Sequence, residues 1–138
     1  MEKLAIYTDG ASQGNPGNAG IGIVIYDDNN NIVEEFSEYI GYTTNNIAEY
    51  TALKTALIKA INLKAKAVDL YLDSELVVKQ INGEYKVKNK GLKPLYVAVK
   101  DLLKNFESYT INHIPREMNK EADRLANSGI RDYLSNKS

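Results

Sequence analysis

The chain has 138 residues, of which 43% are hydrophobic and 25% are charged, and its formal net charge is −1. These values are typical of one globular domain with a single core, and they exclude a globally basic nucleic-acid coat. The absence of cysteine excludes disulfides and thiolate metal sites. No apolar run approaches the ~20 residues of a membrane span, and the first residues do not form a secretory or transit signal, so we expect a cytoplasmic protein that does not bind membranes.

The first third of the chain is predicted to form a meander of three antiparallel strands. Residues 3–9 alternate between two faces, and a polar loop is expected at residues 12–20. Residues 21–26 are apolar and rich in β-branched side chains. After an Asp- and Asn-rich turn, residues 32–40 return as the third strand.

The rest of the chain predicts helices alternating with strands. The expected elements are a helix at 46–62, a strand at 68–73, a helix at 74–82, a loop at 84–90, a helix at 94–106, a strand at 109–114 and a helix at 119–133. This order implies an α/β fold with a mixed sheet of about five strands, in which an antiparallel meander joins parallel strands and helices cover both faces. We expect a single domain over residues 1–134 and a short polar tail at 135–138.

Four acidic residues lie in short segments that do not need an acid for folding. Asp9 and Asp73 close strand patterns, so both carboxylates emerge at one carboxyl edge if these strands are parallel neighbours. Glu49 extends the buried stripe of its helix, and Asp123 lies in the first turns of the last helix. Two carboxylates ~4 Å apart repel by about 4 kcal/mol at an effective dielectric of 20. A divalent metal removes that cost, so the pattern predicts a carboxylate-held Mg²⁺ site acting on phosphate esters.

Each acid also has a purely structural interpretation. Asn46 and Glu49 fit a capping box, and Asp73 could cap the helix that follows it. Asp9 could stabilise a turn at the glycine after it, and Asp123 could complement a helix N-terminus. If all four interpretations were correct, the four acids would occur at these positions in one chain by coincidence. This favours a shared site.

Four segments resemble type 1 ribonuclease H in order and spacing, across nearly the whole chain. They are Tyr-Thr-Asp-Gly-Ala-Ser with Gly-Asn-Pro-Gly after it, Thr-Thr-Asn-Asn-Ile-Ala-Glu, Asp-Ser-Glu-Leu-Val, and Ile-Pro-Arg-Glu-Met-Asn-Lys-Glu-Ala-Asp-Arg-Leu-Ala. The chain is most similar to the short, archaeal-like branch of this family. The resemblance implies a ribonuclease H-like fold and an endonuclease that hydrolyses the RNA strand of RNA/DNA hybrids, leaving 5′-phosphate and 3′-hydroxyl ends.

The resemblance also implies which residues form the site. The family's acids bind two Mg²⁺ ions, for which Mn²⁺ can substitute, and these ions activate the attacking water and stabilise the departing 3′ oxygen. By position the metal ligands are Asp9, Glu49, Asp73 and Asp123. Contacts to RNA, including its 2′-hydroxyls, are expected from Gly10, Ser12, Asn15, Asn45 and Asn46. Thr44 is a candidate to bind a phosphate of the DNA strand, and its structural alternative is to cap the helix that follows it.

Three departures from the family pattern affect the expected contacts. Glu75 stands where many members carry a Gln that touches RNA, so it either weakens hybrid binding or faces solvent. Bacterial members have a mobile His that assists product release. Here the only histidine, His113, falls within a strand pattern, so we favour Arg116 for that role. The basic lobe of bacterial members is reduced to a short segment at 83–92, whose lysines either follow a nucleic-acid backbone or are simply solvated.

Other functions remain compatible with the sequence. The same fold supports nucleases that act on double-stranded RNA or DNA, and a non-catalytic hybrid-binding module is a further alternative. The expected partner is an RNA/DNA hybrid; no obligate protein partner is evident, and we expect a monomer. Because no separate hybrid-binding domain precedes Leu4, we also expect modest affinity with a steep salt dependence.

Overall fold

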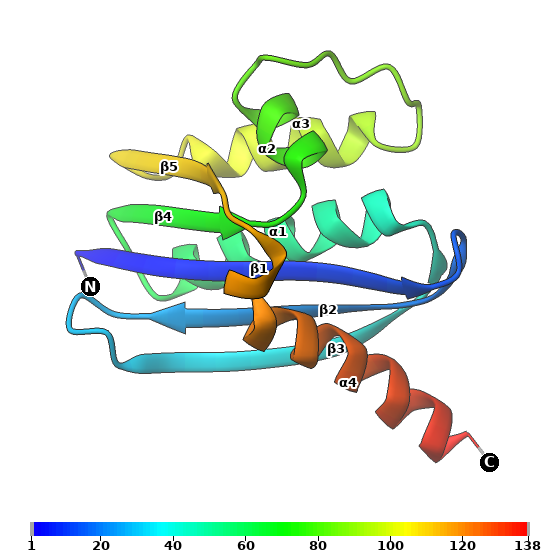
Figure 1. The fold of residues 1–138 in the computed structure, drawn as a ribbon. Helices are drawn as coiled ribbons and strands as arrows, with labels where there is room; N and C mark the ends of the chain where they lie inside the picture. The colour runs from blue at the N-terminus through cyan, green and yellow to red at the C-terminus, as the bar shows by residue number, and fades with distance from the viewer. Residues whose placement is uncertain (1, 138) are drawn as a thin grey trace.

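A five-stranded mixed sheet organises the computed structural model, which describes residues 2–137 (Figure 1). The strand order is β3-β2-β1-β4-β5. The strands are β1 (Lys3–Gln13), β2 (Gly17–Tyr26), β3 (Ile32–Thr43), β4 (Ala67–Leu72) and β5 (Ser108–His113). The helices are α1 (Asn45–Asn62), α2 (Glu75–Ile81), α3 (Lys93–Leu103), α4 (Lys120–Asn136) and the short 3₁₀ helix η1 (Arg116–Met118). Among these, no helix has the length and apolar character needed to cross a bilayer.

The pairing of the strands confirms the predicted fold class. β1 pairs with β2 and β2 with β3 in antiparallel fashion, whereas β1 pairs with β4 and β4 with β5 in parallel. The β1–β4 ladder ends with the pair Thr8 and Leu72. Asp9 and Asp73 each follow that last pair, so the register alone places the two acids side by side at one edge of the β1–β4 ladder.

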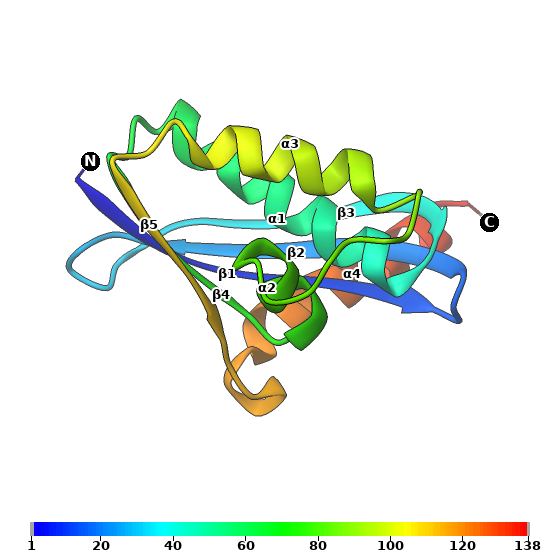
Figure 2. The same cartoon turned by 90° about the horizontal axis from the view of Figure 1, so that it is seen from above.

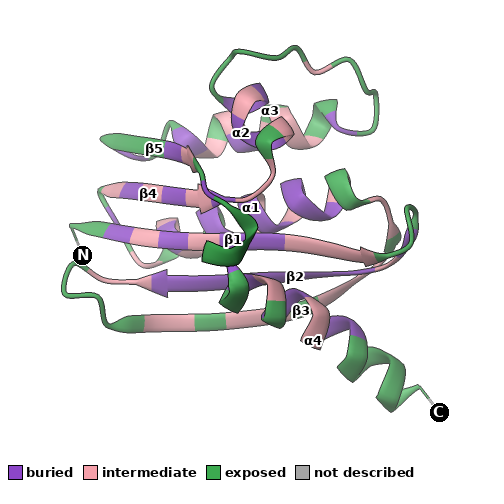
Figure 3. Ribbon diagram, viewed as in Figure 1, coloured by how far each residue is buried: buried purple, intermediate pink, exposed green. Residues whose placement is uncertain are grey.

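Helices cover both faces of the sheet, with α1 and α3 on one side and α4 on the other (Figure 2). The alternating apolar residues of β1 and β4 point toward α1, and the main core lies between them. Its largest fully buried side chains include Leu4, Ile6, Ile23, Leu53, Leu57 and Leu70. Figure 3 shows that burial is concentrated in the central strands and α1, while the end of α4 is exposed.

The predicted loop at residues 12–20 is largely wrong. β1 continues to Gln13 and β2 already begins at Gly17, so only residues 14–16 form the turn. The segment is rich in small and polar residues, which favour loops when considered alone. The ladder between β1 and β2 overrides this preference, because it continues from the pair Gly10 and Ile21 to the pair Gln13 and Asn18. Likewise β3 extends three residues beyond its predicted end, to Thr43.

The helix boundaries differ from the predictions by one to three residues. α1 begins at Asn45, one residue early, and α3 ends at Leu103, three residues early. α4 continues to Asn136, so residues 135 and 136 of the predicted polar tail are helical, while Ser138 lies outside the described residues. The 3₁₀ helix η1 was not predicted, since a three-residue element leaves no periodic pattern.

Two glycines of β2 set how closely α4 approaches the sheet. A Cβ at Gly22 would lie 2.0 Å from the carbonyl oxygen of Ala122, and one at Gly20 would lie 2.3 Å from that of Ala126. Both clashes involve helix backbone, so any side chain at either position would push α4 outward. The two glycines therefore allow the first turns of α4, where Asp123 lies, to pack directly against β2.

A buried hydrogen bond next to the site supports the packing of α1 on α2. The hydroxyl of Tyr50 donates to Oε1 of Gln80 at 2.6 Å, and both residues are buried. Tyr50→Phe leaves that oxygen without its donor, so we expect the free energy of unfolding to fall by about 1–3 kcal/mol in urea titrations. Tyr42→Phe, at a side chain that is 70% exposed, is the matched control. Equal stability of Tyr50→Phe and wild type would contradict this assignment.

Candidate active site

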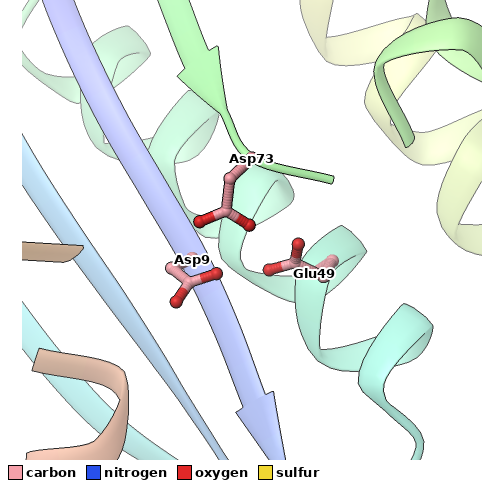
Figure 4. Close-up of side chains that lie close together, drawn as sticks. All are labelled: Asp9, Glu49 and Asp73. Atoms are coloured by element: carbon pink, nitrogen blue, oxygen red, sulfur yellow. The ribbon is translucent and has the colours of Figure 1, made fainter. Parts of the chain in front are cut away.

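Three carboxylates from separate elements converge at one end of the β1–β4 ladder (Figure 4). Asp9 lies in β1, Glu49 in the second turn of α1, and Asp73 directly after β4. Each offers a carboxylate oxygen, and these three oxygens all lie within 4.8 Å of one another. Asp9 is only 6% exposed and Glu49 only 8%. The predicted convergence of these three acids is thus present in the fold.

Gly10 explains how α1 brings Glu49 to Asp9. A Cβ at Gly10 would lie 2.3 Å from the carbonyl carbon of Ala48, so only glycine lets the start of α1 approach β1 this closely. The main-chain N–H of Gly10 donates a hydrogen bond to the Glu49 carboxylate. Glu49 therefore points at β1, not back along its own helix.

The structural alternatives for three of the acids are wrong. Thr44 caps α1, because its hydroxyl accepts the N–H of Ile47 at 3.2 Å, so Asn46 and Glu49 form no capping box. Ser74, not Asp73, caps α2 by accepting the N–H of Val77 at 3.3 Å. Nor does Asp9 stabilise a turn, since β1 continues past it to Gln13. These acids are therefore not required for local structure.

Burial and mutual repulsion perturb the titration of the cluster. Desolvation raises the pKa of Asp9 to about 11, and the charges of Glu49 and Asp73 add to the effect. Desolvation also raises the pKa of Glu49 to about 7, although hydrogen bonds from Asp9 and Gly10 oppose the shift. Such a group of buried oxygen donors matches the ligand preference of Mg²⁺ and Mn²⁺, whose charge would offset the repulsion. The residues present thus fit a divalent cation.

Asp123 borders the same site but stands apart from the three-carboxylate cluster. It lines the acid-containing cavity, of about 470 Å³, together with Asp9, Glu49 and Asp73. It is half-buried on α4, where Nδ2 of Asn127 donates to its Oδ1 at 3.2 Å. A hydrogen bond with the Asp123 carboxyl contributes to the raised pKa of Asp9. The fourth predicted acid therefore faces the cavity from the opposite face of the sheet to Glu49.

Most of the predicted RNA contacts lie around this cavity. Gly10, Ser12, Asn45 and Asn46 line it. Oγ of Ser12 donates to Oδ1 of Asn45 at 2.6 Å, and the N–H of Asn45 donates to Oδ1 of Asn15 at 3.0 Å. Asn15 is thereby tied to the cavity rim without lining it. Glu75 does not line the cavity; it is exposed and forms an ion pair with Lys79 at 3.4 Å.

Arg116 and His113 occupy different environments. Arg116 opens η1 and is the one Lys or Arg side chain among the cavity-lining residues of the described chain. His113 is the last residue of β5, where it is exposed and paired with Leu72 outside the cavity lining. The expectation that His113 belongs to a strand is confirmed.

Sequence reasoning missed Asn119. The sequence pattern places it only at the start of the last helix, yet it is 1% exposed and its Nδ2 donates to Oδ2 of Asp73 at 3.1 Å. The available signal was its position four residues before Asp123, which places both on one helical face.

Comparisons with known proteins are consistent with this geometry. The chain matches the family described as "Reverse transcriptase-like" over residues 7–129. Ribonuclease HI of Halobacterium salinarum is 41% identical over 130 residues, covering 94% of this chain and 65% of that protein. A bifunctional protein of Mycobacterium tuberculosis is 41% identical over 129 residues, covering 93% of this chain and 35% of that protein. The chain thus spans about a third of the mycobacterial protein and just under two thirds of the archaeal one.

Solved structures extend the similarity to three dimensions. The crystal structure of RNase H1 from Halobacterium salinarum has a TM-score of 0.92 at 40% identity, covering 94% of this chain and 98% of that chain. LC11-RNase H1, which was isolated from compost and solved in complex with an RNA/DNA hybrid, has a TM-score of 0.89 at 42% identity. That match covers 95% of this chain and 99% of the other.

Proposed function

This chain belongs to the type 1 ribonuclease H family, and we propose that it is a metal-dependent endonuclease that hydrolyses the RNA strand of RNA/DNA hybrids. The products would carry 5′-phosphate and 3′-hydroxyl ends. The observation that carries the proposal is the convergence of Asp9, Glu49 and Asp73 within 4.8 Å in a mostly buried site. The similarity to an RNase H1 solved with such a hybrid supports the choice of substrate.

Asp9, Glu49 and Asp73 would hold Mg²⁺ or Mn²⁺, with Asp123 completing the ligands for a second ion. Ions held by these residues would supply a nucleophilic water at neutral pH and positive charge to offset that of the phosphate. The chain itself supplies the geometry. The N–H of Gly10 orients the Glu49 carboxylate, and burial of Asp9 limits competition from bulk water. Asp123 and Asp73 line the same cavity and are less buried than Asp9 and Glu49, so their carboxylates are the more accessible to an incoming phosphate.

The polar groups at the cavity rim suit recognition of RNA. Ser12, Asn15 and Asn45 form one hydrogen-bonded network, so their positions are fixed before substrate binds. Hydroxyl and amide groups can both donate to and accept from a 2′-hydroxyl, which DNA lacks. Thr44 already accepts a hydrogen bond as the cap of α1. Its own hydroxyl proton remains available to a DNA-strand phosphate, so capping and binding are compatible.

Arg116 is proposed to contact the cleaved phosphate and assist product release. A hydrogen bond to a charged group contributes ~1.5–3 kcal/mol, so Arg116→Ala should lower kcat by about 10- to 100-fold. His113→Ala should leave kcat unchanged, because His113 lies outside the cavity lining. Steady-state cleavage of a labelled hybrid measures both variants. The reverse pattern, a loss with His113→Ala alone, would assign the role to the histidine.

The substrate class is tested by a panel of labelled duplexes. An RNA/DNA hybrid, a double-stranded RNA and a double-stranded DNA of one sequence are each incubated with the protein and Mg²⁺. We expect cleavage of the RNA strand of the hybrid at a rate well above that of either other duplex. Faster cleavage of double-stranded DNA or RNA would identify a nuclease of different specificity, and binding of the hybrid without turnover in Mg²⁺ or Mn²⁺ would identify a non-catalytic module.

A further inference from the structure

Asn119 connects the segments that carry three of the four acids. Its Nδ2 donates to Oδ2 of Asp73 at 3.1 Å and to the main-chain oxygen of Thr8, the residue before Asp9, at 2.9 Å. Its own main-chain oxygen accepts the N–H of Asp123 at 3.1 Å. The side chain is 1% exposed and sits where η1 meets α4. One buried residue thus links the ends of β1 and β4 to the first turn of α4.

The orientation of the Asn119 amide is fixed by its neighbours. Both of its hydrogen-bond partners are acceptors, so a reversed amide would place Oδ1 against the oxygens of Thr8 and Asp73. In the observed orientation Oδ1 is buried and makes no hydrogen bond within residues 2–137. A buried, unpaired oxygen destabilises a fold. Packing alone therefore does not explain an asparagine at this position. Its contribution is the pair of hydrogen bonds that Nδ2 donates.

The hydrogen bond from Asn119 holds the Asp73 carboxylate. It follows the end of β4, and Ser74, not Asp73, caps the next helix. Within the described chain, the bond from Asn119 is the only hydrogen bond that the Asp73 carboxylate accepts. Glu49, by comparison, is held by the main chain of Gly10.

We propose that Asn119 is a positioning residue, which orients the Asp73 carboxylate toward Asp9 and Glu49 and so sets the affinity of the site for divalent cations. The inference rests on the proposed metal-dependent function. Residues that orient a metal ligand without touching the metal typically change metal affinity or activity by about 10- to 100-fold when they are replaced. An effect of that size is expected here.

The test measures binding of Mn²⁺ to metal-free protein by isothermal titration calorimetry. Asn119→Leu keeps the side-chain volume but removes the donor, and Asn119→Ala serves as a second variant if the leucine does not fold. We expect each to weaken Mn²⁺ binding by about 10- to 100-fold. Asn112→Ala is the matched control, because Nδ2 of Asn112 also donates twice, to Leu70 and Thr110, but away from the cavity. Its Mn²⁺ affinity should equal that of the wild type.

A double-mutant cycle separates positioning from general structural damage. If Asn119 acts through Asp73, then Asn119→Leu should cause no further loss of Mn²⁺ affinity in an Asp73→Asn background. Full additivity of the two losses, or wild-type affinity in folded Asn119→Leu protein, would overturn the inference. Failure of the proposed function looks different, since the wild-type protein would then bind no Mn²⁺ and cleave no hybrid. In cleavage assays the variant should lower kcat and leave the KM for hybrid unchanged.

Discussion

Asp9→Asn is expected to abolish cleavage of RNA/DNA hybrid while making the metal-free protein more stable. The variant loses the most buried of the three clustered carboxylates, and metal catalysis contributes several kcal/mol, so the rate should fall by about 10³-fold or more. Stability should change in the opposite direction. Because burial raises the pKa of Asp9 to about 11, unfolding at pH 8 releases a proton. Wild-type stability therefore falls as the pH rises above the unfolded-state value near 4.

Asparagine removes that pH-dependent cost. At pH 8 the raised pKa alone would correspond to about 5 kcal/mol, and burial of the asparagine amide offsets part of this. In metal-free buffer at pH 8 we therefore expect a net gain of about 2 kcal/mol, which corresponds to a rise in Tm of roughly 6–10 °C. The gain should shrink toward pH 4, and Mg²⁺ should raise the Tm of the wild type more than that of the variant. Asp101→Asn, at an exposed acid paired with Lys104, is the control and should change neither property. Near wild-type cleavage by Asp9→Asn would end the metal-dependent interpretation.

Gly10→Ala is expected to disrupt the site through the backbone. The new Cβ would lie 2.3 Å from the carbonyl carbon of Ala48 and 2.4 Å from the main-chain nitrogen of Glu49, so α1 must move away from β1. This movement would weaken the hydrogen bond from Gly10 to Glu49 and separate Glu49 from Asp9. We expect a loss of about 1–3 kcal/mol in the free energy of unfolding and a large loss of divalent-cation affinity. Urea unfolding and calorimetry with Mg²⁺ measure the two effects.

Gly91→Ala is the matched control for this substitution. The nearest atom to its Cβ would be the side-chain oxygen Oδ1 of Asn89 at 3.1 Å, so a small shift of that side chain is enough, whereas the clash at Gly10 is with backbone. The control should retain both stability and cation binding. If Gly10→Ala also retained them, close approach of α1 to β1 would not be what brings the carboxylates together.

The convergence of the acids could be predicted because it follows from regular patterns. Asp9 and Asp73 both end apolar alternations, so parallel pairing of their strands was enough to bring them together. Glu49 lies on the apolar stripe of α1, which determines the face it occupies. The periodic patterns thus indicate where each acid lies on its own strand or helix. The parallel pairing of β1 with β4 then brings Asp9 and Asp73 close together.

Features that depend on tertiary contact could not be predicted in the same way. The need for glycine at position 10 could not be predicted, because the close approach of the α1 backbone leaves no pattern in the residues around it. Residues 12 and 13, and 17 to 20, have loop-like composition and become strand only through pairing across the hairpin. Asn119 resembles an ordinary residue before a helix, and its contacts to Thr8 and Asp73 span more than forty residues of sequence.

Cleavage of a hybrid with end-group analysis tests most directly whether the carboxylate site acts through divalent cations. A labelled RNA/DNA hybrid is incubated with protein in Mg²⁺ and in EDTA, and the termini of the RNA fragments are identified. We predict fragments with 5′-phosphate and 3′-hydroxyl ends in Mg²⁺ and no cleavage in EDTA. Fragments ending in a 2′,3′-cyclic phosphate would show that the 2′-hydroxyl is the nucleophile. Undiminished cleavage in EDTA would show that no metal is needed. Either result would contradict the role assigned to Asp9, Glu49 and Asp73.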